Sequence, residues 1–150
     1  MDDYYYMEEA YKYAEKAYKL NEVPIGCVIV KDENIIGSGY NLRNTKKNAL
    51  YHAEIIAIDE ACNFINDWRL EDAHLFVTVE PCPMCAGAIL QSRIKRLVFG
   101  TRNAKAGSCY SILNILDNSS LNHRVEVVEG VMQEESSNLM KKFFSELRHK

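Results

Sequence analysis

The sequence predicts a single α/β domain in which helices cover the faces of a sheet. Short runs of β-branched and apolar residues alternate with segments whose apolar residues recur at helical spacing. A chain of 150 residues is the size of one domain, so residues 1–150 are expected to share one fold. A content of 47% hydrophobic and 26% charged residues, with 7 glycines and 3 prolines, excludes a disordered or low-complexity chain.

The first half of the chain is expected to form a helix, a hairpin and a second helix. Apolar residues near the N-terminus recur at helical spacing between Lys and Glu, which is typical of an amphipathic helix. Two β-branched runs follow, joined by the polar turn 31–34, and this pattern predicts a β-hairpin. The polar segment 41–48 reads as a loop. The expected elements are a helix ending near residue 21, strands at 25–30 and 35–40, and a helix at 52–64.

The second half repeats the alternation of strand and helix. Leu75-Phe76-Val77-Thr78-Val79 is an apolar run of strand length, and the segment that begins at Pro83 has a helical pattern. Two further β-rich runs precede a final amphipathic segment. The expected elements are strands at 75–79, 97–100 and 125–128, a helix at 83–91, and a last helix through residues 143–147.

Composition also limits the location of the protein and the state of its cysteines. No apolar run reaches the roughly 18 residues that a membrane span needs, and the N-terminus lacks the features of a signal peptide. We therefore expect a cytoplasmic protein without a membrane partner. The 5 cysteines are an odd number in such a chain, so a disulfide framework is a weaker explanation for them than metal or redox chemistry.

The net charge of −3 gives no overall case for nucleic-acid binding, but basic residues gather in one part of the sequence. A stripe of this kind can follow a phosphate backbone, or it can be a solvated face with no partner. The residues of this stripe, which have no acidic residue among them, are Arg93, Lys95, Arg96, Arg102 and Lys105.

Two short motifs stand where helices are expected to begin. The first is His52-Ala53-Glu54, and the second is Pro81-Cys82-Pro83-Met84-Cys85. Cys82 and Cys85 lie three positions apart, so the first turn of a helix directs both sulfurs the same way. A zinc ion accepts two thiolates and one imidazole, which His52 can supply, and three protein ligands leave a fourth position open for water.

Glu54 indicates that such a zinc site is catalytic. It follows His52 by two positions, so it can reach the water in the open coordination position without binding the metal itself, as a proton shuttle must. A metal clip that only stabilises an RNA-binding module is the alternative, and it has no use for this carboxylate. His-x-Glu followed by Pro-Cys-x-x-Cys is the signature of zinc nucleobase deaminases.

Beyond these motifs, nearly the whole chain resembles the bacterial tRNA adenosine deaminases. The resemblance includes Glu22-Val23-Pro24-Ile25-Gly26, Trp68-Arg69-Leu70, Asn122-His123-Arg124 and Phe143-Phe144. It implies a cytidine-deaminase-like three-layer α/β/α sandwich with a five-stranded mixed sheet, a homodimer, and one zinc ion per subunit. It also implies that adenosine becomes inosine at the wobble position of a tRNA anticodon loop.

Carried onto this chain, the resemblance assigns a role to each candidate residue. His52, Cys82 and Cys85 would hold zinc, and Glu54 would move protons. Substrate-binding roles fall on Val23, Asn41 and Ala53, with Asn41 hydrogen-bonded to the flipped nucleoside. RNA-binding roles fall on Arg102, Asn103 and Lys105, within the basic stripe.

The chain departs from the family pattern in loops that would face the substrate. Asn48-Ala49-Leu50-Tyr51 precedes His52 where the family usually has Asp-Pro-Thr-Ala, Asn103 replaces Asp, and Cys109-Tyr110 replaces small residues. These changes leave the zinc motifs untouched. They keep a second interpretation open, in which the same catalyst deaminates a free nucleoside or nucleobase such as cytidine, cytosine, guanine or adenosine.

Overall fold

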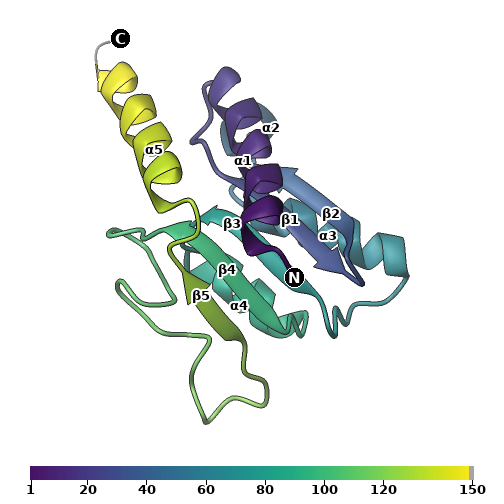
Figure 1. The fold of residues 1–150 in the computed structure, drawn as a ribbon. Coiled ribbons are helices and arrows are strands. Elements are labelled where there is room, and N and C mark those ends of the chain that lie inside the picture. The colour runs from purple at the N-terminus through teal and green to yellow at the C-terminus, as the bar shows by residue number, and fades with distance from the viewer. Residues whose placement is uncertain (149–150) are drawn as a thin grey trace.

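The computed structural model describes residues 1–148, and in it a five-stranded sheet lies between two layers of helices (Figure 1). The three-layer α/β/α sandwich expected from the sequence is therefore confirmed. The strands are β1 (Gly26–Lys31), β2 (Asn34–Tyr40), β3 (His74–Val79), β4 (Arg96–Thr101) and β5 (Glu126–Glu129). The helices are α1 (Asp3–Lys19), α2 (Arg43–Lys46), α3 (Ala53–Ile65), α4 (Pro83–Gln91) and α5 (Gln133–Arg148).

The sheet is mixed, and its strand order is β2-β1-β3-β4-β5. β1 pairs antiparallel with both β2 and β3, so β2 and β3 run in the same direction. β4 pairs parallel with β3, and β5 pairs parallel with β4. The carboxyl ends of β2, β3 and β4 therefore lie at one edge of the sheet, together with the start of β1.

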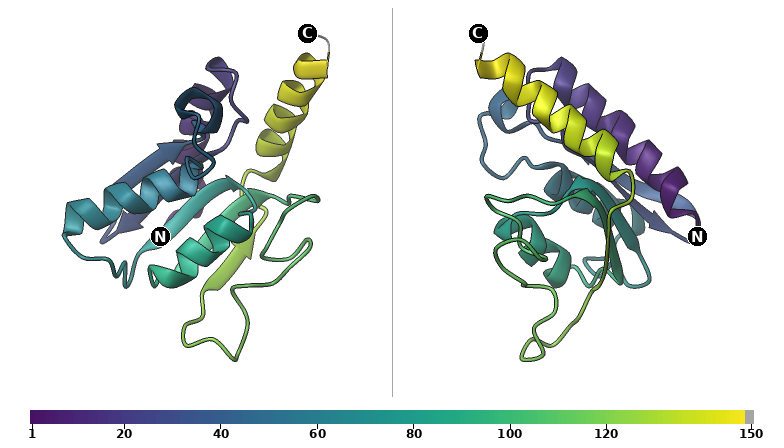
Figure 2. Two further views of the ribbon diagram at one scale, coloured as in Figure 1. Left: turned by 180° about the vertical axis from the view of Figure 1, so that it is seen from behind. Right: turned by 60° about the vertical axis from the view of Figure 1, so that its left-hand side comes forward.

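Each face of the sheet carries its own apolar core. Side chains alternate between the faces along a strand. Cys27 and Ile29 of β1 accordingly pack with residues of α3 and α4, whereas Val28 and Val30 pack with α1. Figure 2 shows α1 and α5 on one side of the sheet and α3 and α4 on the other.

The start of α3 lies directly on the end of β2. A Cβ atom on Gly39 would collide with the carbonyl oxygen of Ala53, so only glycine allows this approach. The contact places the N-terminus of α3, and with it His52, at the edge where β2 ends.

Two details differ from the expectations. The segment 41–48 is not entirely a loop, because residues 43–46 form α2. Four residues are too few to show helical periodicity, and the first turn is held from elsewhere, by the carboxylate of Glu22. The first helix ends at Lys19, and Asn21 takes a left-handed conformation with φ of 59°.

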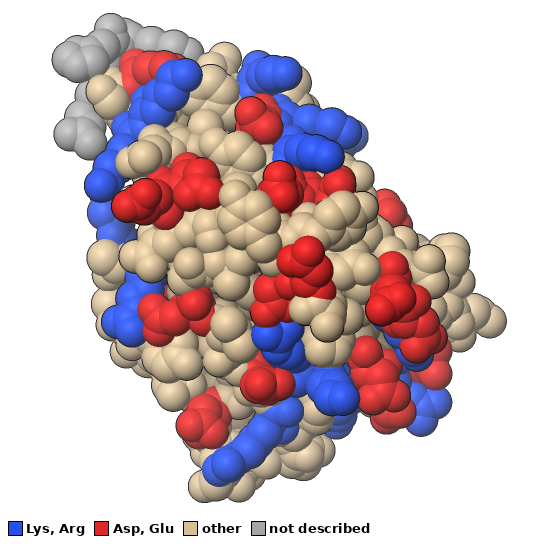
Figure 3. Space-filling model, viewed as in Figure 1, with Lys and Arg blue, Asp and Glu red and all other residues tan. Residues whose placement is uncertain are grey.

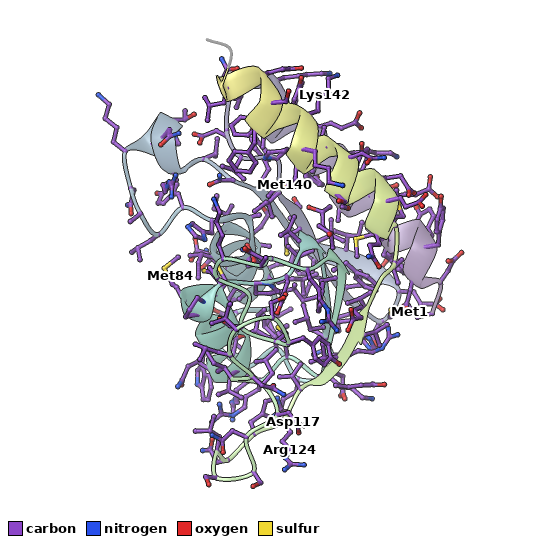
Figure 4. The ribbon with its side chains drawn as sticks, turned by 90° about the vertical axis from the view of Figure 1, so that its left-hand side faces the viewer. Met1, Met84, Asp117, Arg124, Met140 and Lys142 are labelled. Carbon is purple, nitrogen blue, oxygen red and sulfur yellow. The ribbon has the colours of Figure 1, made fainter. Side chains whose placement is uncertain are left out.

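A long irregular connection joins β4 to β5. Its far end lies near Asp117 and Arg124, whose charged groups are 3.7 Å apart (Figure 4). All five cysteines are free, in agreement with the expectation of no disulfide framework. None of the helices within residues 1–148 combines the length and apolarity that crossing a bilayer requires.

Candidate active site

The topology brings the two sequence motifs together. α3 begins at the edge where β2 ends, and α4 begins directly after β3 at the same edge. His52 is the N-cap residue of α3 and Cys82 is the N-cap residue of α4, so two helix N-termini converge there.

The side chains of His52, Cys82 and Cys85 form a group that can hold a metal ion. Nδ1 of His52 lies 3.6 Å from Sγ of Cys82 and 3.5 Å from Sγ of Cys85, and the ligand atoms all lie within 4.8 Å of one another. Bonds of about 2.0 Å to nitrogen and about 2.3 Å to sulfur, at the tetrahedral angle, separate those atoms by roughly 3.5 Å. The spacing and the donor set therefore fit a tetrahedral ion such as zinc.

Among residues 1–148, no fourth His, Cys, Asp or Glu joins this group. His149, a further histidine of the chain, lies outside the described residues. A site with three protein ligands leaves one position for water or substrate, which is the arrangement of catalytic rather than structural zinc.

The two thiols compete for one proton. The pKa of Cys82 is lowered to about 4 because Cys85 hydrogen-bonds to it and His52 lies beside it, although burial opposes the shift. The pKa of Cys85 is raised for the complementary reasons, its hydrogen bond to Cys82 and its burial. His52 has a raised pKa because it hydrogen-bonds to Cys82. A divalent cation would remove this competition by stabilising both thiolates.

Glu54 lies in the first turn of α3 beside this group, and only 3% of its surface is exposed. Burial, which disfavours the charged carboxylate, raises the pKa of Glu54 to about 7, and the nearby Cys82 acts in the same direction. A carboxyl group with a pKa near neutrality can both accept and return a proton at neutral pH.

The candidate residues open onto one cleft of about 860 Å³. It is large enough for a nucleotide, since ligand pockets typically measure about 300–1,000 Å³. All the site residues predicted from the sequence line it except Cys85, which is buried behind Cys82. The predicted residues on its walls are Val23, Asn41, His52, Ala53, Glu54, Cys82, Arg102, Asn103 and Lys105.

Asn41 is buried at the inner wall of the cleft. Its Nδ2 donates to the carbonyl of Val23 at 3.3 Å, and its Oδ1 accepts from the backbone N–H of Arg43 at 3.2 Å. These bonds fix the amide plane, and the second hydrogen on Nδ2 and the second lone pair on Oδ1 are available to a ligand.

The basic stripe of the sequence does not form one surface. Arg96 is the first residue of β4 and Arg102 directly follows its last residue, so the two are about 20 Å apart at the rise of a strand. Arg96 pairs with Asp3, away from the cleft, whereas Arg102 and Lys105 line it. Figure 3 shows acidic and basic side chains intermixed over one face of the molecule rather than a continuous basic surface.

Asn103 contributes to the loop that follows β4 as well as to the cleft. Its Oδ1 accepts from the backbone N–H groups of Lys105 and Ala106, both at 3.2 Å. The side chain therefore closes a turn, as Asn commonly does, and this turn presents Lys105 to the cleft.

Helix α5 forms a wall that motif analysis did not place at the site. Its amphipathic pattern predicted a helix here, and the family resemblance included Phe143-Phe144, but neither assigned the helix a place at the site. Figure 4 looks onto this side of the molecule, with Met140 on α5 and Met84 at the start of α4 below it. The residues of α5 that line the cleft are Ser137, Met140, Lys141, Phe144 and Leu147.

Sequence reasoning also missed two buried acids beside the cleft, Glu22 and Glu80, which are 1% and 2% exposed. Burial alone raises the pKa of Glu80, but hydrogen bonds from Ser111, Tyr110 and Asn103 outweigh it and lower the pKa to about 2. Glu80 is therefore ionised. The available signal was its place directly before Pro81 and Cys82, at the end of a strand.

The comparisons with known proteins all point to deaminases. The model of the MafB19-like deaminase family matches residues 1–148. The tRNA-specific adenosine deaminase of Bacillus subtilis (strain 168) is 48% identical over 148 residues, covering 99% of this chain and 92% of that protein. The tRNA-specific adenosine deaminase of Rickettsia bellii (strain RML369-C) is 49% identical over 144 residues, covering 95% and 99% respectively.

Solved structures agree with the fold. A chain from a study of A-to-I editing by tRNA:A34 deaminases at the wobble position of transfer RNA superposes with a TM-score of 0.87 at 36% identity, covering 90% of this chain and 98% of that one. Guanine deaminase from Nitrosomonas europaea, at 18% identity, reaches a TM-score of 0.80 over 93% of this chain and 82% of its own length. The second likeness shows only that the fold is shared.

Proposed function

This chain belongs to the MafB19-like deaminases and, among them, to the tRNA-specific adenosine deaminases, and from that premise we propose that it converts adenosine to inosine by hydrolysis in a tRNA anticodon loop. The reacting adenosine is the one at the wobble position. The observation that carries the proposal is the convergence of His52, Cys82 and Cys85 with the buried Glu54 on one cleft of nucleotide size.

The metal that fits the site is zinc. Two thiolates and an imidazole at tetrahedral spacing are a typical zinc donor set, and we propose one ion per subunit. When bound, zinc supplies a water molecule whose pKa is low enough for it to lose a proton at neutral pH.

Glu54 is proposed as the group that moves protons. It accepts a proton from the water that adds to C6 of adenine, and it returns that proton to the ring nitrogen. Glu54 then accepts the proton of the hydroxyl group on C6 and transfers it to the departing amine, so the C6–N bond breaks, the C6 carbonyl forms and ammonia leaves. Water is consumed and the products are inosine and ammonia. The burial of Glu54 next to His52 and Cys85 supports this assignment, because protons exchanged there are kept from bulk water.

The substrate base is proposed to enter the inner end of the cleft. Val23 and Ala53 offer an apolar lining, and Asn41 offers a fixed amide for hydrogen bonds. A base must leave its stack to reach such a pocket, and this costs less in a single-stranded loop than in a duplex. An anticodon loop is therefore a suitable substrate.

The outer part of the cleft is proposed to contact the RNA backbone. Arg102, Asn103 and Lys105 lie on one wall and Lys141 lies on another, so cations stand beside the opening. Phosphate neutralisation by such cations gives most of the affinity of a nucleic-acid interface.

We also propose a homodimer and a cytoplasmic location. The resemblance to the family suggests the dimer, and exposed apolar side chains support it: Leu50, Ile112 and Leu113 are 56%, 59% and 49% exposed. The location follows from the substrate, since tRNA is decoded in the cytoplasm, and it suits a chain whose five cysteines are free. Light scattering of the purified chain tests the dimer.

The test of the function is the mass of anticodon-loop fragments after incubation of the zinc-loaded protein with a tRNA transcript. The expected result is the conversion of one wobble adenosine to inosine, with no change in a matched transcript that has guanosine at that position. Free adenosine, cytidine, cytosine and guanine are incubated in parallel. Ammonia release from one of these, with the transcript unchanged, would replace the proposal by a free-nucleoside or nucleobase deaminase.

A further inference from the structure

Glu80 is the last residue before the Pro-Cys-x-x-Cys motif, and its side chain is buried beneath the loop that follows β4. Within the described chain, every hydrogen bond to its carboxylate comes from that loop. Oε1 accepts from the backbone N–H of Asn103 at 3.0 Å and from the hydroxyl of Ser111. Oε2 accepts from the N–H groups of Cys109, Tyr110 and Ser111 at 3.0, 2.7 and 3.0 Å.

The loop needs this carboxylate because it contains no strand or helix that would pair its backbone. Buried N–H groups almost always have an acceptor, and an unpaired one costs about 1–3 kcal/mol. Four N–H groups of residues 103–111 find theirs in Glu80. A single side chain thus replaces the pairing that a strand would give.

Gly107 shows how closely the loop surrounds Glu80. A Cβ atom at this position would collide with the Glu80 carboxylate, so the backbone passes where only glycine fits. The neighbouring Ser108 donates its N–H to the carbonyl of Pro81 at 2.9 Å, which joins the loop to the metal-ligand motif a second time.

Part of the loop that Glu80 holds also forms a wall of the cleft. Asn103, Ala104, Lys105 and Ala106 line the cleft opposite the start of α3, while Glu80 stands two residues before the metal ligand Cys82. One side chain therefore fixes the position of this wall relative to the metal ligands.

We propose that Glu80 is a positioning residue for the substrate, because it holds loop 103–111 in a fixed position relative to the metal-ligand motif. With the loop in this position, the RNA can contact the loop while its base reaches the reacting centre. This role deepens the proposed function and rests on it. All the hydrogen bonds that the structure gives the Glu80 carboxylate go to this loop, and Glu80 is not in the metal-ligand group, so its effect passes through the loop.

The opposite wall offers a matched control. Glu22 is equally buried and accepts from the N–H groups of Asn44 and Thr45 at 3.2 and 2.6 Å, which holds α2 and its cleft residue Arg43. The same chemical change at Glu22 should loosen α2 and leave loop 103–111 as it was.

The test combines amide hydrogen exchange with steady-state kinetics on the zinc-loaded Glu80→Gln variant. The amide keeps one accepting oxygen and turns the other into a donor that faces N–H groups. We expect exchange at residues 103 or 109–111 to rise about tenfold, the equivalent of one lost hydrogen bond of about 1.4 kcal/mol. Exchange in β3 and β4 and the zinc content should stay at wild-type values.

With an anticodon stem-loop RNA as substrate, KM is expected to rise about tenfold while kcat changes less than about threefold, because the wall is displaced but Glu54 and the ligands are not. Ser111→Ala removes one donor and leaves the carboxylate, so it should shift exchange and KM in the same direction by less. It serves as the test variant if Glu80→Gln does not fold. Glu22→Gln should raise exchange at residues 44 and 45 only.

Three results would overturn the proposal: unchanged exchange in the loop, faster exchange with unchanged KM, or a loss of kcat that tracks a loss of zinc. Exchange is measured without RNA. If the wild-type chain deaminates no RNA, the proposed function fails and the substrate role of Glu80 with it, while the exchange data still decide whether Glu80 holds the loop.

Discussion

Arg102 forms a two-pronged ion pair with Glu129, its Nε and Nη2 donating to the two carboxylate oxygens at 3.0 and 2.9 Å. The guanidinium also lies over the ring of Tyr110, 5.3 Å from its centre. The charge of Arg102 is therefore partly compensated inside the protein, whereas no ion pair to Lys105 occurs among the described residues. These two cleft cations are not equivalent.

The first prediction concerns RNA binding by these two residues. Lys105→Ala should weaken binding of an anticodon stem-loop and lower the slope of log K against log salt by about 1, because one phosphate contact is lost. Arg102→Ala should lower the slope by less, since it also releases Glu129. Fluorescence anisotropy over a salt series measures both. Equal slopes in Lys105→Ala and the wild type would show that Lys105 is a solvated surface residue that contacts no phosphate.

The second prediction concerns Glu54. Glu54→Ala should bind zinc as the wild type does, because the carboxylate is not one of the ligands, and should lose about 10²–10⁴-fold in kcat, the usual contribution of general acid–base catalysis. Zinc analysis and turnover of the RNA are measured on the same sample. Glu60→Ala, an exposed position on the same helix, is the control and should turn over normally. Full activity in Glu54→Ala would remove Glu54 from the mechanism.

The third prediction concerns the metal ligands. Cys82→Ser should lower zinc affinity by more than about 100-fold, since changes to residues that only support a ligand already cost 10–100-fold. A chelator should abolish turnover by the wild type, and added zinc should restore it. Cys62→Ser is the matched control, because this cysteine lies on α3 outside the ligand group. If Cys82→Ser retained stoichiometric zinc, the assigned ligand set would be wrong.

The grouping of the candidate metal ligands could be predicted from the sequence because it depends on local patterns. His52, Cys82 and Cys85 stand at the starts of helices, and helix starts are marked in the sequence by where apolar periodicity begins. The parallel direction of β2 and β3 then brings both starts to one edge of the sheet. Spacing and topology together leave little freedom for these side chains.

The surroundings of the centre could not be predicted because they depend on pairings between distant segments. Arg102 meets Glu129 only because β4 pairs with β5, and the long connection between these strands has no periodicity. Glu80 finds its partners in a loop whose conformation it helps to determine. Helix α2 has no sequence signal, since its first turn is held by Glu22.

The last prediction concerns stability and pH. Arg96 donates to both carboxylate oxygens of Asp3 at 2.7 and 2.5 Å, joining the start of α1 to the start of β4. The hydrogen bond from Arg96, followed by its charge, lowers the pKa of Asp3 against the opposing effect of burial. A carboxyl group with a lowered folded-state pKa stabilises the fold above its unfolded pKa of 3.8, and this contribution disappears as the pH falls through the folded value.

Arg96→Met should therefore lower the free energy of unfolding by about 1 kcal/mol at pH 7, a value kept small because the pair is partly exposed. The difference from the wild type should shrink as the pH falls below 3.8, where Asp3 becomes protonated. The pKa of His74 is lowered by burial and by the charge of Arg96. Without Arg96 the protonated imidazole of His74 destabilises the fold less at low pH, which also reduces the difference from the wild type. Urea unfolding at several pH values measures this. Arg124→Met, which breaks an exposed pair with Asp117, should change stability by less than about 0.5 kcal/mol. A pH-independent difference for Arg96→Met would show that the pair contributes packing and not charge.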